Sequence, residues 1–122
     1  MAITRISKSS LYKLIEGKVK EETTCIIKFY SNTCHLCHNL QEYYEQISND
    51  EKYTNVHFFA FNVEDDPSIE TRLHFNGVPT ISMVKTGTKR PTIRTISDPD
   101  PPHKHTWFTT RDIKNFIEEE KS

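Results

Sequence analysis

The 122-residue sequence lacks the features that mark membrane, secreted or nucleic-acid-binding proteins. It contains no apolar run of the roughly 18 residues that a membrane-spanning helix needs. Its formal net charge of −1 at pH 7 gives no positive field to attract nucleic acid or an anionic membrane. The opening stretch, MAITRISKSSLYKL, has neither the apolar core nor the cleavage site of a signal peptide. We therefore expect a single cytoplasmic domain, residues 1–122, that binds neither nucleic acid nor a membrane.

Cysteine is scarce as well. The three cysteines, Cys25, Cys34 and Cys37, are odd in number and too few for a disulfide-built scaffold. In a reducing compartment, a close pair such as Cys34 and Cys37 indicates catalysis or metal binding rather than a structural crosslink. Glycine is limited to three residues and alanine to two, a bias that suggests an AT-rich genome, bacterial or viral.

What the sequence does contain is an alternation of strand and helix patterns. Apolar runs rich in β-branched and aromatic residues predict strands over 2–6, 23–30, 56–63, 78–84 and 91–96. Helical spacing and capping residues predict helices that begin at Ser9 or Ser10, directly after the cysteine pair, at Asp66-Pro67, and at Thr109 with Asp112 as its capping partner.

The resulting order is β-α-β-α-β-α-β-β-α. Strands joined through helices make a parallel core, and a final hairpin, turning at Lys85-Thr86-Gly87, adds an antiparallel edge. We predict an α/β fold with a central mixed sheet of four to five strands flanked by helices. The cysteine pair follows strand 23–30, and such folds place their chemistry at the carboxyl ends of parallel strands.

The string CHLCH, residues 34–38, fits a dithiol redox site, a metal site or a covalent haem attachment. Haem attachment would use His38 as an axial ligand, but the sequence shows no export signal and only one such motif. Zinc or an iron–sulfur centre needs four Cys or His ligands, and there is no second C-x-x-C. We therefore favour the dithiol redox site, and we expect this site to need neither a bound cofactor nor a metal.

The sequence resembles the thioredoxin family over nearly its whole length. The landmarks are CIIKFY leading into Cys34-His35-Leu36-Cys37, the segment FNVEDDP, then GVPT at 77–80, KTG at 85–87 and a terminal helix. The His-Leu dipeptide between the cysteines differs from the Gly-Pro typical of the family. The resemblance implies a thioredoxin fold and a thiol–disulfide oxidoreductase that reduces or exchanges disulfides in protein substrates.

The position of the pair indicates separate roles for its members. A helix N-terminus carries unpaired N–H groups and partial positive charge, which favour a thiolate. Cys34 should therefore have a lowered pKa and attack a substrate disulfide, and Cys37 should resolve the mixed disulfide. The alternative is a buried pair of inert thiols.

The resemblance also predicts a substrate groove. It implies that Pro79 is a cis-proline packed against the cysteine pair, in place of an ordinary trans loop proline. Gly77 and Val78 are then expected to offer main-chain pairing to an extended substrate segment. Thr33 is expected on the rim, where relatives carry tryptophan.

Two basic residues depart from the family pattern. Lys28 stands where relatives carry a buried acid behind the second cysteine, and we predict that it modulates Cys37, as a neutral base or as a charge that stabilises the thiolate. The alternative is that its stem carries the ammonium out to water. His35, if protonated, favours the Cys34 thiolate, or else is a solvated loop histidine. Both residues predict that the Cys34–Cys37 couple is less reducing than the couple of standard thioredoxins.

The remaining cysteine and histidines have plainer interpretations. Cys25, on the incoming strand, is expected to be a small apolar filler. His103 and His105 lie in the loop 98–105, which we expect to be flexible and polar, with a metal or partner contact as the alternative.

The expected partners follow from the redox interpretation. They are disulfide-containing protein substrates and an electron donor, either a thioredoxin-reductase-like enzyme or glutathione, serving a monomer that takes part in electron transport. A second hypothesis is a non-catalytic thioredoxin-fold binding module in a host or viral complex, with the cysteines incidental.

Overall fold

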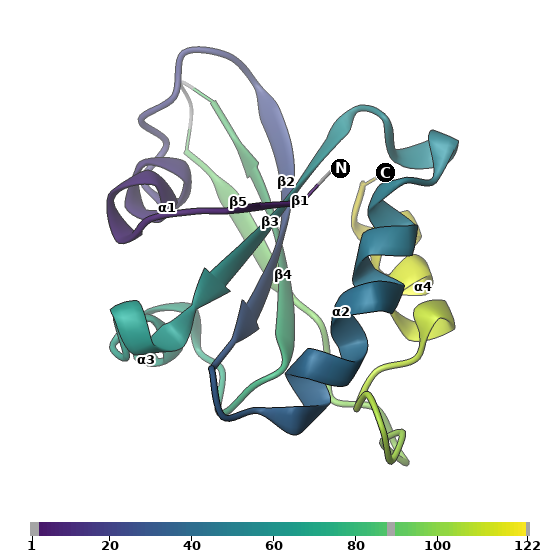
Figure 1. Ribbon diagram of the computed structural model, residues 1–122. Helices are drawn as coiled ribbons and strands as arrows, with labels where there is room; N and C mark the ends of the chain where they lie inside the picture. Colours follow the sequence, from purple (N-terminus) through teal and green to yellow (C-terminus); the bar gives the residue numbers. More distant parts are fainter. Residues whose placement is uncertain (1–2, 88–89, 122) are drawn as a thin grey trace.

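A computed structural model describes residues 3–87 and 90–121 and contains a five-stranded sheet in the order β1-β3-β2-β4-β5 (Figure 1). The strands are β1 (Ile3–Arg5), β2 (Thr23–Tyr30), β3 (Val56–Asn62), β4 (Thr80–Thr86) and β5 (Thr92–Thr95). The helices are α1 (Lys8–Ile15), α2 (His35–Ser48), α3 (Ile69–Leu73) and α4 (Thr110–Lys121), with short 3-10 turns at Glu51–Tyr53 and Val63–Asp65. The predicted α/β fold with a mixed sheet is confirmed.

The sheet combines parallel and antiparallel pairing. Strand β3 lies parallel to both β1 and β2, whereas β4 runs antiparallel to β2 and β5 antiparallel to β4. The parallel pairing is therefore limited to β1, β3 and β2; β4 runs in the opposite direction, and β5 returns to the direction of β2. Central strands β2 and β3 are the apolar runs of the sequence, as burial on both faces requires.

The helices cover both faces of the sheet, α1 and α3 on one and α2 and α4 on the other (Figure 1). Because successive strand side chains point to opposite faces, Cys25, Ile27 and Phe29 of β2 join the core cluster with α1 and α3. Ile26 joins the second cluster, with α2 and α4. The same alternation places Lys28 on the α2 side.

Several predicted boundaries need correction. Ser7, rather than Ser9 or Ser10, caps α1, because its hydroxyl accepts a hydrogen bond from the Ser10 N–H. Helix α3 begins at Ile69 and not at Asp66-Pro67, since Asp66 instead closes a 3-10 turn.

The hairpin and the last helix complete the comparison. Lys85 and Thr86 belong to β4 rather than to a turn, and residues 88–89 lie outside the described residues. The Thr109–Asp112 capping pair is confirmed by two reciprocal hydrogen bonds, of 2.8 and 3.1 Å. No helix in the described part of the chain is long and apolar enough to cross a bilayer.

Candidate active site

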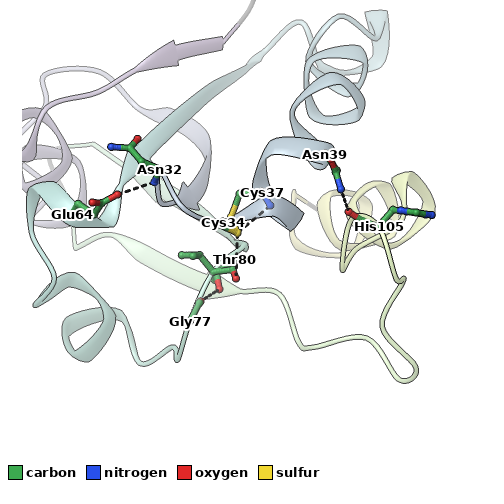
Figure 2. Close-up of a disulfide and its surroundings, with 9 residues drawn as sticks. Asn32, Cys34, Cys37, Asn39, Glu64, Gly77, Thr80 and His105 are labelled. Carbon is green, nitrogen blue, oxygen red and sulfur yellow. Dashed lines mark hydrogen bonds between the residues drawn. A yellow bond between two sulfur atoms is a disulfide. The ribbon is translucent and has the colours of Figure 1, made fainter.

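The cysteine pair lies at the junction between β2 and α2. Cys34 is the N-cap of α2 and Cys37 lies in its first turn, 3% exposed. The two sulfurs are joined as a disulfide across a Cα–Cα distance of 5.2 Å, and the Cys37 N–H donates to Cys34 Sγ at 3.0 Å (Figure 2). The same N–H group and the helix dipole would stabilise a thiolate on Cys34 after reduction.

A second segment, Gly77 to Thr80, lies against the disulfide. The Val78 carbonyl oxygen is 3.7 Å from Cys34 Sγ, and the Val78–Pro79 peptide bond is cis. Gly77 has a φ of +82°, where glycine is favoured. Its N–H donates to Glu70 Oε1 at 2.7 Å. Its carbonyl accepts from Thr80 Oγ1 at 2.8 Å, as Figure 2 shows. Both Gly77 backbone groups therefore have internal partners, whereas the Val78 carbonyl faces the Cys34 sulfur.

The loop between β2 and Cys34 is held by the end of β3 and the 3-10 turn that follows it. The Asn32 N–H donates to Glu64 Oε2 at 2.7 Å (Figure 2), and Asn62 Nδ2 donates to Asn32 Oδ1 at 3.1 Å. Sequence reasoning missed these supports, because the partners are 32 and 30 residues apart and no local pattern joins them. Thr33 and His35, on either side of Cys34, are both exposed on the rim.

Lys28 is buried, with an exposed fraction of 5% for the whole residue, which argues against the alternative in which its stem carries the ammonium out to bulk water. Burial disfavours the charged form and lowers the pKa of Lys28 to about 8. Its Nζ lies 5.3 Å from the ring centroid of Tyr44 and 5.8 Å from that of Tyr30. Modulation of Cys37 by Lys28 stays a prediction.

The loop 98–105 is more anchored than the sequence predicted. The backbones of His103 and Trp107 exchange two hydrogen bonds, of 2.9 and 3.0 Å. Asn39 Nδ2, on α2, donates to the His105 carbonyl at 2.8 Å (Figure 2). The His103 and His105 rings are 5.9 Å apart. Residues 3–87 and 90–121 contain no group of three or more His, Cys, Asp or Glu side chains arranged to hold a metal.

Cys25 is fully buried, and burial raises the pKa of its thiol to about 12. We therefore expect iodoacetamide at pH 8 to alkylate the half-buried Cys34 first in the reduced native protein, and Cys25 only in denaturant. Mass spectrometry would count the labels. Labelling of Cys25 as fast as Cys34 would show that this strand opens readily.

The helix-flanked mixed sheet and the bonded dithiol at a helix N-terminus together define the class of thioredoxin-fold dithiol proteins. The family model described as thioredoxin matches residues 7–101, so the chain belongs to the thioredoxin family. Membership and the Cys34–Cys37 pair support thiol–disulfide oxidoreductase chemistry in general.

Solved structures agree with this fold at low sequence identity. The thioredoxin of Malassezia sympodialis is 15% identical with a TM-score of 0.70, over 98% of this chain and 91% of that chain. Mitochondrial thioredoxin 3 of Saccharomyces cerevisiae is 18% identical with a TM-score of 0.67, over 96% and 94%. Thioredoxin f2, solved in complex with ferredoxin: thioredoxin reductase, is 16% identical with a TM-score of 0.71, over 99% and 96%. A search of curated proteins finds no match.

Proposed function

We propose that the protein reduces, or exchanges, disulfides in protein substrates through the Cys34–Cys37 dithiol. The observation that carries this proposal is the Cys34 sulfur at the N-cap of α2, within 3.0 Å of the Cys37 N–H and 3.7 Å of the Val78 carbonyl. A sulfur so placed is stabilised as a thiolate and lies beside backbone that an extended peptide can pair with.

The reaction runs in two balanced steps. The Cys34 thiolate attacks one substrate sulfur, a mixed disulfide forms, and the other substrate sulfur leaves as a thiolate that takes a proton. The Cys37 thiolate then attacks Cys34 Sγ, so the substrate's second thiol is released and the Cys34–Cys37 disulfide forms. Two electrons pass from the dithiol to the substrate.

The surrounding residues would position the substrate and set the thiol chemistry. Val78 and Pro79 shape the groove beside Cys34, with Gly77 allowing the turn and Thr33 on the rim. Lys28, on the sheet face that α2 covers, would alter the reactivity of the Cys37 thiol. His35, on the exposed side, would alter the reactivity of the Cys34 thiol. These roles are proposals that rest on placement and on the family resemblance.

The partners follow from the redox role. Solved relatives include a thioredoxin seen with ferredoxin: thioredoxin reductase, and a structure concerned with resolving a 1-Cys peroxiredoxin through glutathione and thioredoxin systems. By analogy, we propose protein disulfides as substrates of this chain and a reductase or glutathione as electron donor, in a cytoplasmic monomer.

The first test is the reduction potential of the Cys34–Cys37 couple, measured by equilibration in glutathione buffers and mass counting of alkylated thiols. We expect a reversible two-thiol transition above about −270 mV, because positive charge on Lys28, and on His35 when it is protonated, would stabilise the reduced, thiolate-bearing form. Absence of any transition would exclude the redox function. A potential at or below that value would remove the proposed tuning by these two residues.

A further inference from the structure

A pocket of about 460 Å³ opens beside the disulfide, a volume in the range of small-molecule sites. Its lining residues come from β1, β2, β3, the loop before α2, and α2 as far as Glu45. Its lining includes Cys34, Cys37 and Lys28. One space therefore brings together both members of the redox pair and the buried lysine.

Lys28 lines this pocket and has no counter-ion among the described residues. Within the described part of the chain its Nζ has neither an ion pair nor a hydrogen bond, only the faces of Tyr30 and Tyr44. The neighbour of Lys28 on β3 is Ala60, a small residue that also lines the pocket and leaves space beside the lysine. The Lys28 residue is 5% exposed and its ammonium has no partner of opposite charge among the residues that the structure describes, so it carries a desolvation cost that an anion entering the pocket would offset.

The other charges around the pocket leave room for such an anion. Arg5, at the β1 side, forms an exposed ion pair with Asp65 at 3.1 Å. On α2, His38 and Glu45 line the opposite wall, and Glu45 is the one carboxylate among the described lining residues. Glu45 makes no ion pair with Lys28. Because Arg5 is paired with Asp65, Lys28 is the cation of the pocket that has no ion-pair partner among the described residues.

We propose that this pocket is an anion subsite that receives the carboxylate of a low-molecular-weight thiol, and that this thiol reduces the Cys34–Cys37 disulfide. The proposal rests on the proposed redox function and identifies a substrate class for the same site. A carboxylate paired with Lys28 would hold the small thiol next to the disulfide, since Lys28 and both cysteines line one pocket.

The chemistry is ordinary thiol–disulfide exchange. The thiolate of the bound molecule attacks Cys34 Sγ, the Cys34–Cys37 bond breaks, and Cys37 leaves as a thiolate that takes a proton. A second small thiol then attacks the mixed disulfide and releases the Cys34 thiolate together with a small-molecule disulfide. Two thiols supply the two electrons, so no further reductant is needed.

The test compares thiols of similar size and different charge on the oxidised full-length protein. Rate constants for 3-mercaptopropionate, 2-mercaptoethanol and cysteamine are measured from the appearance of protein thiols and corrected for each thiol's own pKa. We expect the carboxylate thiol to react fastest and the cationic thiol slowest. In Lys28→Met the ratio of 3-mercaptopropionate to 2-mercaptoethanol should fall about tenfold, as for loss of one charge-assisted hydrogen bond. The ratio cancels any effect of the substitution on the disulfide itself.

The matched control is Lys13→Met, which removes the same charge from an exposed position on α1 away from the pocket. Its ratio should equal that of the wild type. An equal ratio in Lys28→Met, or no preference for the carboxylate in the wild type, would overturn the anion subsite while the redox function stands. Failure of all three thiols to reduce the disulfide would instead overturn the redox function and the subsite with it.

A measurement on the wild type alone covers the case in which Lys28→Met does not fold. Propionate should inhibit reduction by 3-mercaptopropionate competitively, whereas propionamide, of the same shape but uncharged, should not. Equal effects of the two compounds would contradict a charge-selective subsite.

Discussion

Replacing Cys34 by serine is expected to reduce disulfide reduction to the rate seen without protein. In the proposed mechanism Cys34, at the N-cap of α2, supplies the attacking sulfur, and a serine hydroxyl in the same place is not ionised near neutral pH. The fold should survive, because Cys34 is only half-buried and a hydroxyl can accept the same N–H bond. The measurement is reduction of a disulfide-containing protein such as insulin, with circular dichroism as the check on folding.

Two further variants make this result specific. Cys37→Ser should leave a stable mixed disulfide between Cys34 and the substrate, visible as an added mass, because the resolving thiol is gone. Cys25→Ala should keep its turnover, because Cys25 is buried on the opposite face of β2. A physiological role that survives the Cys34 and Cys37 substitutions together would favour the binding-module hypothesis.

Replacing Lys28 by methionine is expected to stabilise the oxidised protein by about 3 kcal/mol at pH 7. The folded pKa of Lys28 is about 8, against an ordinary value of 10.5, because burial penalises the charged form. Below pH 8 both the folded and the unfolded chain hold the proton, so the wild type bears the full cost of a buried charge. Methionine fills a similar space without that cost.

The pH dependence has a definite sign. Between pH 8 and pH 10.5 the unfolded chain still binds the Lys28 proton while the folded chain has released it, so wild-type stability rises with pH relative to the variant. The stability gap should shrink to about 1 kcal/mol at pH 9.5. Urea unfolding of both oxidised proteins at several pH values measures the gap, with Lys13→Met as the exposed control. A difference in unfolding free energy between the two proteins that does not change with pH would show that folding leaves the pKa of Lys28 unchanged.

The fold class could be predicted from the sequence because burial leaves local periodic patterns. The apolar run 23–30 became β2 with the same bounds, and the Thr109–Asp112 capping pair starts α4 as predicted. Boundaries failed where two local signals competed. Ser7, Ser9 and Ser10 are all suitable caps, and only the packing of Leu11, Leu14 and Ile15 selects the register that makes Ser7 the cap.

By itself the sequence determined the chemistry available to this protein: two cysteines one helical turn apart at a strand–helix junction, with a GVPT segment further along. Side-chain alternation along a strand also places Lys28 on the opposite face from Phe29, whatever the rest of the chain does. Those features depend only on residues close in sequence. They were sufficient to indicate the family and the redox pair.

Only the tertiary structure decided what surrounds that pair. The approach of Val78 to Cys34, the Glu64 contact that holds the loop, and the pocket shared by Lys28 and Cys37 all join residues distant in sequence. Whether Lys28 reaches water depends on α2 lying over β2, and no local pattern encodes that packing. Burial arises from the whole fold, so the lowered pKa of Lys28, and the anion subsite we propose from its unpaired charge, could emerge only there.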